Sequence, residues 1–490
     1  MFTYTGHPLV DIGVATITAF AGKKDPALLE QADLEAVASY MEENYLVEPL
    51  KSFLTVAFPN SGFTQPAYEK APEKRKIYAQ KVLWSFRPHL PLSGEKCIFT
   101  GKPAVGLSLD VKDELPPGRT FRQHIPLVTG EEVINFHPYG EAGLPVSGEA
   151  LLAIQAFPLG CAKVSGRLLA VHADDPSFTY QFARHFLREN RKAILLAQQA
   201  GEKKLAEPPR RVATLLVEKL LELEKEKKDF QQDEERPVSV TVYHLSNSGQ
   251  GVALDIYYLP LEITEFLFLA VTPKYLAAWE KLKARGWEIV ETKRSSKSKS
   301  SGEEGKQPSY NVLFEDLFKL PEEAPQFIRR YFLRRPARAK MPGDPRANYS
   351  LFNEASLVSW DLTRLFLEKV VSMQKSRIEQ IRKLGDVLAE YIHRENDRKF
   401  FHAFLTVKNY DNLRASLIRL NVACLKNSQE PVVGFHQFVE IFEIGEDLPY
   451  SDWRLARDLV LIRMVERLYD LGWIEANKES LQDAELFSEE

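Results

Sequence analysis

The feature that most constrains the fold is a long run of apolar residues, spaced three and four apart, in the C-terminal part of the chain. Over residues 362–392 this spacing places one apolar stripe along a helix. The stripe consists of Leu365, Leu367, Val370, Val371, Ile378, Ile381, Leu384, Leu388 and Ile392. Because such a stripe must be buried against other helices, the pattern predicts a long amphipathic helix in a small bundle. Helical patterns continue to the end of the chain, so we expect a C-terminal helical bundle over 341–490.

Residues 1–340 have a more varied pattern and are expected to form a mixed body. Apolar spacing predicts helices over 26–46, 149–157, 176–200 and 211–230. The Gly- and Pro-rich stretch 88–148 leaves room for few long elements, so an irregular insertion is expected over 90–150. We therefore predict an α+β fold in two regions, 1–340 and 341–490. A length of 490 residues suits two to four domains.

Two further segments interrupt the helical pattern of the body. Period-two alternation predicts a β-hairpin over 237–260, with the sequence SNSGQG at its tip. The alternating residues are Val238, Val240 and Val242 before the tip and Leu254, Ile256 and Tyr258 after it. Residues 293–309, KRSSKSKSSGEEGKQPS, are polar and low in complexity, which predicts a disordered loop.

Composition narrows the class of protein. The formal net charge of −4 excludes a polycation, so any nucleic-acid surface must be a local basic patch. Three cysteines, Cys97, Cys161 and Cys424, cannot form a disulfide framework, which fits a reducing compartment. The N-terminal segment has no basic region typical of a signal peptide, and no stretch reaches about 18 apolar residues. We therefore expect a cytoplasmic protein without a membrane segment.

The sequence offers little that is typical of an enzyme. It has no HExxH, no GxSxG and no Walker A loop. In VHADDPSF, His172, Asp174 and Asp175 could form a metal cluster of a nuclease, but Asp175 before Pro176 is the pattern of a helix cap, which we favour. His137, near Glu141, is interpreted as a surface or packing residue. We expect no catalytic activity and no cofactor, and keep a metal-dependent nuclease as the alternative.

Four scattered segments resemble one known family. The opening YTGHPLVDIGVATITAFAGK (4–23) and the stretch NSGQGVALDIYYLP (247–260) are similar to two signatures of the CXXC–CXXC large subunit of type I-B CRISPR Cascade complexes. That family carries two Cys-x-x-Cys pairs between the signatures. Here CIFTGKPAV (97–105) and VSGEALLAIQAFPLG (146–160) match the two pairs, and the four ligand positions become Cys97, Thr100, Ser147 and Ala150.

The departure from the family pattern has a chemical consequence. Structural zinc takes four nitrogen or sulfur ligands, and one thiolate with Thr100, Ser147 and Ala150 cannot hold it. We therefore expect a zinc knuckle that is retained as a fold but binds no metal, with packing by Ile98, Phe99 and Leu152 in place of the ion. The alternative is that Cys97 is an unrelated buried thiol.

The resemblance implies a subunit that does no chemistry itself. In that family the large subunit holds the crRNA 5′ handle end of the assembly, beside the backbone and handle-binding subunits. It inspects the PAM in target double-stranded DNA, stabilises the R-loop and recruits a helicase-nuclease, while guide pairing reads the remaining sequence. The same subunit also occurs in Tn7-like CRISPR-associated transposons, beside a transposition adaptor. A scaffold unrelated to CRISPR is a further alternative.

The resemblance also concerns the C-terminal region. Helical domains of this kind can be made separately, from an internal start, as small subunits. Met341 follows the basic stretch and precedes the helical region, so we expect it as such a start. Met373 is expected inside a helix and would be a poor start.

Candidate nucleic-acid contacts are chosen by residue type and position. The segment RRYFLRRPARAKMPGDPR (329–346) concentrates positive charge that could contact phosphates. In the turn 58–68, amides and hydroxyls could read a PAM base edge, and Phe63 could wedge a base step. Each of these sets could instead be ordinary surface or packing residues. The candidates are Asn60, Ser61, Phe63, Thr64, Gln65, Lys102, Arg119, Arg122, Ser246, Asn247, Gln250, Arg329, Arg330, Arg334, Arg335, Arg338 and Lys340.

Overall fold

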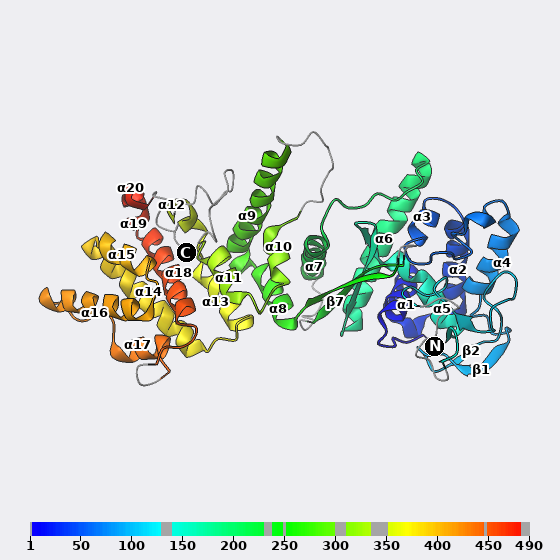
Figure 1. Cartoon of the computed structure of the whole chain (residues 1–490), viewed down its shortest axis with the longest axis horizontal. Coiled ribbons are helices and arrows are strands. Elements are labelled where there is room, and N and C mark those ends of the chain that lie inside the picture. Colours follow the sequence, from blue (N-terminus) through cyan, green and yellow to red (C-terminus); the bar gives the residue numbers. More distant parts are fainter. Residues whose placement is uncertain are drawn as a thin grey trace. The chain divides into compact units, whose positions relative to one another are not determined.

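The computed structural model describes residues 2–128, 140–229, 238–247, 251–298, 310–334, 351–444 and 448–481 (Figure 1). The chain separates into two compact units, Met1–Leu261 and Glu262–Glu490. The sequence suggested a boundary at 340/341. That position lies outside the described residues, and the structure divides the chain after Leu261 instead. Residues 262–334 therefore belong to the helical unit rather than to the mixed body.

The N-terminal unit combines helices with short antiparallel strands, and the α+β class is confirmed. Its helices are α1 (Pro8–Phe20), α2 (Gln31–Tyr45), α3 (Leu50–Leu54), α4 (Pro72–Leu83), α5 (Gly148–Ala156), α6 (Pro176–Ala200) and α7 (Val212–Asp229), with the short turns η1 (Pro26–Leu28), η2 (Pro66–Tyr68) and η4 (Phe157–Gly160). Two small sheets pair β1 (Leu92–Lys96) with β2 (Pro103–Val105) and β3 (Arg119–Thr120) with β4 (Leu144–Pro145). A four-stranded antiparallel sheet has the order β5 (Ala162–Val164), β6 (Arg167–Ala173), β7 (Val240–Ser246), β8 (Ala253–Leu259).

Most of the predicted helices of this unit are confirmed. The ranges 149–157, 176–200 and 211–230 correspond to α5, α6 and α7. The range 26–46 is divided into η1 and α2, because Glu30 and Asp33 form a capping box that starts a new helix. The irregular character of 88–148 is also confirmed for its described part, which holds only the short strands β1 to β4.

Helix α1 lies at the centre of the N-terminal unit. Its residues Leu9–Thr18 are all buried, as expected for a helix that is apolar on every side. It packs against α5 and α6 (Figure 1). A Cβ at Gly13 would lie 1.9 Å from the Ala153 carbonyl oxygen, so only glycine allows α5 to approach this closely. The first signature therefore encodes a helix that neighbours contact closely.

The predicted hairpin is confirmed as β7 and β8, with Val240 paired to Leu259 and Ser246 to Ala253. Its second strand is the edge of the four-stranded sheet. The alternating side chains Leu254, Ile256 and Tyr258 are 41 %, 59 % and 54 % exposed, so the alternation is correct but this face is not part of a core.

The described part of the C-terminal unit is almost wholly helical, and the predicted helical C-terminal region is confirmed. Its helices are α8 (Leu261–Ala270), α9 (Pro273–Ser298), α10 (Val312–Leu317), α11 (Ala324–Phe327), α12 (Leu351–Glu354), α13 (Trp360–Lys369), α14 (Lys375–Glu395), α15 (Arg398–Leu405), α16 (Tyr410–Lys426), α17 (Phe435–Phe442), α18 (Trp453–Asp470), α19 (Trp473–Ala476) and α20 (Lys478–Leu481). The shorter turns are the π-helical η5 (Ile328–Phe332) and the 3-10 turn η7 (Ala355–Leu357). Phe266 and Phe327 pack on Phe366, with ring centroids 5.3 and 5.1 Å away, which joins the segment before residue 334 to the bundle.

Three expectations about this unit are wrong. The predicted single helix over 362–392 is broken into α13 and α14, because Ser372 adopts a positive φ of 54° between them. Met373 lies in this connection rather than inside a helix. Residues 293–298 of the expected disordered loop continue α9, while 299–309 lie outside the described residues, as does Met341.

Candidate functional site

The two segments that resemble degenerate Cys pairs lie side by side. The Ile98 amide donates to the Pro145 carbonyl at 3.1 Å, and the hydroxyl oxygens of Thr100 and Ser147 are 3.1 Å apart. Two residues further along, the Lys102 Nζ donates to Glu149 Oε1 at 2.9 Å. The contacts thus recur at every second residue of both segments. We call the residues 97–102 and 145–149 together the knuckle.

The local geometry of the knuckle follows from its sequence. The Gly101 amide closes a turn onto the Cys97 carbonyl at 2.9 Å, with Gly101 at a φ of +67° that favours glycine. Ser147 is the N-cap of α5 and accepts from the Ala150 amide at 3.4 Å. Cys97 and Ala150 are both buried. A hydrogen bond between two hydroxyls therefore connects the second position of one pair with the first position of the other.

One expectation about the packing of the knuckle is wrong. Ile98 is 44 % exposed, so it does not fill the place of an ion. Leu152 is fully buried in the core beneath, and Phe99 faces a cavity beside the knuckle.

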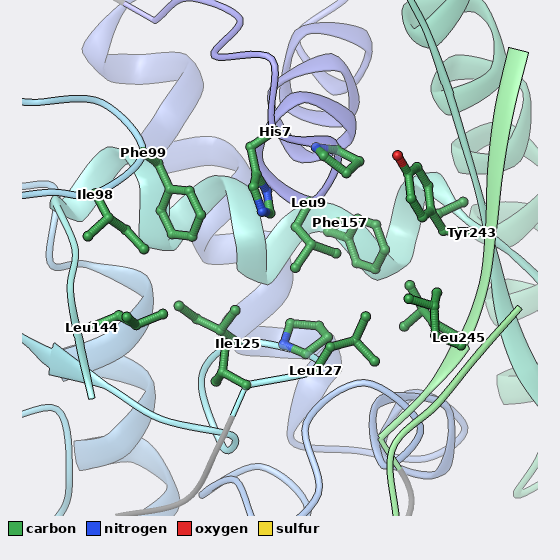
Figure 2. A pocket seen from close by; sticks show the side chains of 15 residues that line it. His7, Leu9, Ile98, Phe99, Ile125, Leu127, Leu144, Phe157, Tyr243 and Leu245 are labelled. Carbon is green, nitrogen blue, oxygen red and sulfur yellow. The ribbon is translucent and has the colours of Figure 1, made fainter. Parts of the chain in front are cut away.

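This cavity has a volume of about 320 Å³ and is almost entirely apolar (Figure 2). Its walls come from segments far apart in the chain: the start of α1, the knuckle, residues 125–128 and the hairpin strands β7 and β8. We call it the knuckle pocket. Figure 2 shows the His7 ring between Phe99 and Leu9, with Tyr243 on a facing wall. The rings of His7 and Phe99 are in edge contact, with centroids 4.8 Å apart.

A buried carboxylate holds the loop that carries His7. Asp11 accepts from the Thr5 amide at 2.6 Å, from the Gly6 amide at 2.9 Å and from His172 Nε2 at 3.2 Å. Burial raises the pKa of the Asp11 carboxyl, but these hydrogen bonds outweigh it, so its pKa lies below the usual value. Asp11 is in the first signature, and its structural role is to position the loop at the pocket.

The second signature also contributes a fixing contact. The Asn247 amide donates to the Val56 carbonyl at 2.8 Å, and its side-chain Nδ2 lies 3.4 Å from the Ala57 carbonyl and 3.3 Å from that of Arg122. Asn247 is fully buried and Ser246 is buried beside it. The expected contact of these two side chains with RNA is therefore wrong. Gln250 lies outside the described residues.

The turn at 58–68 is mostly part of the core. Phe63 is fully buried, with its ring 5.5 Å from Tyr45 and 5.0 Å from Tyr78, so its expected role as a wedge is wrong. Ser61 and Thr64 are buried too, and the Thr64 hydroxyl donates to the Phe58 carbonyl at 3.1 Å. These hydroxyls are buried because the apolar side chains next to them, Phe58 and Phe63, pack into the core.

Two candidates of this turn remain accessible. Asn60 is exposed at a φ of +63°, and Gln65 is half-buried. They are the members of the turn that could still meet a base edge.

The predicted phosphate contacts near the knuckle differ in availability. Arg119 is buried and donates to Glu95 at 2.6 Å, to Glu141 and to the Gly143 carbonyl at 3.3 Å, so the expected phosphate contact is wrong. Lys102 is half-exposed but paired to Glu149. Among the described residues, no carboxylate lies within ion-pair distance of Arg122. Arg122 is therefore the available cation of the three.

The described arginines of the basic segment are neutralised within the C-terminal unit. Arg329 donates to the buried Asp458 at 2.6 Å, and Arg330 donates to Asp316. Arg334 makes two hydrogen bonds to Glu354, of 2.8 and 2.6 Å, and both residues are buried.

These three arginines are structural ion pairs rather than the expected phosphate contacts. The pattern of charge in the sequence did not show this, because the partner carboxylates lie between 14 and 129 residues away. Arg335, Arg338, Lys340 and Arg346 lie outside the described residues.

The alternative metal cluster of a nuclease is dispersed. His172 is paired to Asp11, and Asp174 accepts from Ser239. Asp175 accepts from the Ser177 amide at 2.8 Å as the N-cap of α6, which confirms the helix-cap interpretation. His137 lies outside the described residues, and Glu141 pairs with Arg119.

A different grouping could hold a cation in principle. Ligand atoms of His185, Glu222 and Glu226 lie within 4.8 Å of one another. However, Lys219 already lies 3.1 Å from Glu222 and 2.8 Å from Glu189, which in turn is 3.1 Å from His185. The ammonium group therefore supplies the positive charge that these carboxylates need.

His124 is a residue whose role the sequence did not suggest. It is fully buried, its Nδ1 accepts from the Phe121 amide at 3.2 Å and its Nε2 donates to the Leu109 carbonyl at 3.0 Å. Burial lowers the pKa of this imidazole to about 4. It immediately precedes Ile125 in the pocket wall, so a neutral histidine stabilises that wall.

No protein-family model, no curated protein and no solved structure matches this chain. In the described residues, none of the helices combines the length and apolar character needed to cross a bilayer.

Proposed function

We propose that the chain is the non-catalytic large subunit of a crRNA-guided type I-B Cascade. In this role it would hold the crRNA 5′ handle end, inspect the PAM of target double-stranded DNA and stabilise the R-loop. It would work with the backbone and handle-binding subunits and with small subunits made from its own C-terminal region. It would then recruit a downstream helicase-nuclease.

One observation carries this proposal. The four segments that resemble the family are separated by up to about 240 residues in the sequence, yet they meet around the knuckle pocket. His7 comes from the first signature, and Leu254 comes from the second. The two segments that match the Cys pairs contribute Phe99 and Phe157. Unrelated chance similarities would have no reason to converge on one cavity, so the convergence supports reading them as one pattern.

The accessible polar residues suit this role. Asn60 and Gln65 are our remaining candidates for reading the PAM, because amides fit an adenine edge. Arg122 is our candidate for a phosphate contact among the described residues, and Arg335, Arg338 and Lys340, outside them, stay predictions. Substitution of Asn60 or Gln65 by alanine should weaken binding to some PAM sequences more than to others. Equal loss on every PAM would remove both residues as readers.

The decisive experiment is to purify the tagged chain from its own cell and to sequence the bound RNA. A class of short RNAs with a constant 5′ handle and variable spacers is the expected result. Recovery of no RNA, or of RNA without a repeat-derived handle, would overturn the proposal.

The same preparation distinguishes the two downstream partners. A co-purifying helicase-nuclease indicates interference, whereas a transposition adaptor indicates a Tn7-like CRISPR-associated transposon. Mass spectrometry of untagged material tests the internal start, because a separate product beginning at Met341 should accompany the full-length chain.

A further inference from the structure

We propose that the knuckle pocket binds one unstacked nucleobase of a single-stranded RNA. This inference rests on the proposed function and deepens it, because it names the part of the RNA that the pocket would take. The structural basis is a largely apolar cavity with aromatic walls that contains the Tyr243 hydroxyl and one buried polar atom, His7 Nδ1, without a partner among the described residues.

The shape and lining of the cavity suit a planar ring. A volume of about 320 Å³ lies at the lower end of the range of small-molecule pockets, roughly 300–1,000 Å³. Aromatic side chains of His7, Phe99, Phe157 and Tyr243 line it. Proteins that bind single-stranded RNA hold splayed-out bases by stacking them on such rings.

The two polar atoms indicate a ligand with a polar edge. His7 Nδ1 is buried and has no hydrogen-bond partner among the described residues, although an unpaired buried nitrogen is costly. Tyr243 also lines the cavity and carries a hydroxyl that can donate or accept a hydrogen bond. Burial lowers the pKa of the His7 imidazole, so the ring is neutral near pH 7 and presents either a donor or an acceptor. Burial also keeps Tyr243 protonated, because it raises the pKa of the phenol.

Other ligand classes fit less well. A fatty acid needs a cation for its carboxylate, and the described residues that line the cavity include no charged side chain. A purely apolar side chain of a partner protein would leave the buried His7 Nδ1 without a hydrogen bond. A nucleobase satisfies both requirements, because its faces are apolar and its edge carries donors and acceptors.

Positive charge is available for the phosphates that accompany a base. Lys96 is exposed and lies two residues before Ile98, which lines the cavity. Arg122 lies three residues before Ile125, which also lines it. Within the described part of the chain, neither cation lies within ion-pair distance of a carboxylate.

The test uses the full-length chain and fluorescent single-stranded RNA. The probe has the sequence of the co-purified handle, or is oligouridine if no handle co-purifies, and carries 2-aminopurine at one position at a time. We expect the emission of one position to change on binding, because that base leaves the stack and enters the pocket.

Two pocket variants and a matched control make the test specific. Phe99→Leu keeps an apolar side chain but removes the ring, and should weaken binding about tenfold. Tyr243→Phe removes only the hydroxyl and should weaken binding roughly two- to tenfold. Phe435→Leu makes the first substitution at a residue of the other unit that is 73 % exposed, and should change nothing.

The outcomes separate this inference from the proposed function. An equal response of all positions, or wild-type binding by both pocket variants, would overturn the base pocket even if handle RNA co-purifies. A position-specific response that both variants weaken would support the pocket even if no handle RNA is found, and the Cascade role alone would then fail.

Discussion

The knuckle and the arginine segment 329–334 both contain residues that the sequence suggests for nucleic-acid binding. In the structure they differ in whether their polar and charged groups already have partners. The knuckle is closed by a neutral hydrogen bond between Thr100 and Ser147, and the cavity beside it contains a buried nitrogen, His7 Nδ1, that has no partner among the described residues. In the arginine segment, Arg329 and Arg334 are each paired to a buried carboxylate. A concentration of charge is thus a weaker sign of a binding surface than a polar group left unsatisfied, since a buried pair has already used its charge.

The largest effect is expected when cysteines are restored at the three knuckle positions where the family that this chain resembles has zinc ligands. The triple change Thr100→Cys, Ser147→Cys and Ala150→Cys should create a four-cysteine site with Cys97 that binds one equivalent of zinc. Structural zinc binding is worth on the order of 10 kcal/mol in small zinc-binding peptides. Metal content after dialysis and the zinc dependence of the melting temperature measure it. A variant that folds but binds no zinc would show that the four positions do not converge.

The interpretation of the arginine segment as structural can be tested by removing one charge of a buried ion pair. Arg334→Ala should reduce the free energy of unfolding by about 3–5 kcal/mol, because it removes the two hydrogen bonds and the opposite charge that Arg334 supplies to the buried Glu354. Urea denaturation followed by circular dichroism measures the change, and Arg334→Lys serves as the control that keeps the charge. Unchanged stability together with loss of RNA or DNA binding would instead indicate that Arg334 contacts a phosphate.

The N-terminal unit, which contains the knuckle, should be less stable to acid than the C-terminal unit, which contains the arginine segment. The pKa of His124 falls from its usual 6.5 to about 4 in the folded chain, so its contribution is fully present above pH 6.5 and is lost as the pH falls toward 4. A shift of this size corresponds to roughly 3 kcal/mol. The pKa of Asp316 in the C-terminal unit is lowered below 3.8, since its hydrogen bonds and the charge of Arg330 outweigh the effect of burial, and its ion pair therefore persists across this window.

The expected result is that the N-terminal unit loses protection first. Hydrogen exchange at pH 7 and pH 4.5, resolved by peptide, measures this order. The variant His124→Asn should remove most of the pH dependence of the N-terminal unit. Simultaneous loss of protection in both units would contradict the assignment to His124.

The smallest expected effect concerns the hydrogen bond that closes the knuckle. Thr100→Val keeps the shape of the side chain but leaves the Ser147 hydroxyl without this partner, and should cost about 1 kcal/mol of stability. Chemical denaturation measures it, with Thr55→Val at a solvent-exposed position of the same unit as the control. A loss several times larger would indicate that the bond organises the pocket as well as closing the turn.

Features that depend on neighbours in the chain could be predicted. The helices α5, α6 and α7, the cap Asp175 and the hairpin of β7 and β8 all follow from spacing, capping residues and alternation. The proximity of the two knuckle segments could also be predicted, because the resemblance places Thr100 and Ser147 in one set of ligand positions. The break at Ser372 was missed, since the apolar spacing continues across it while the backbone does not.

The sequence by itself determined the local elements and the residue types available for a site, because helix and strand periods are properties of adjacent residues. Only the tertiary structure decided which of these residues remain accessible. Phe63 entered the core, Arg334 met Glu354, and His7, Phe99 and Tyr243 came together around one cavity. The physical reason is that desolvation and ion pairing depend on groups brought close by folding, and no local pattern in a chain encodes which distant partner will arrive.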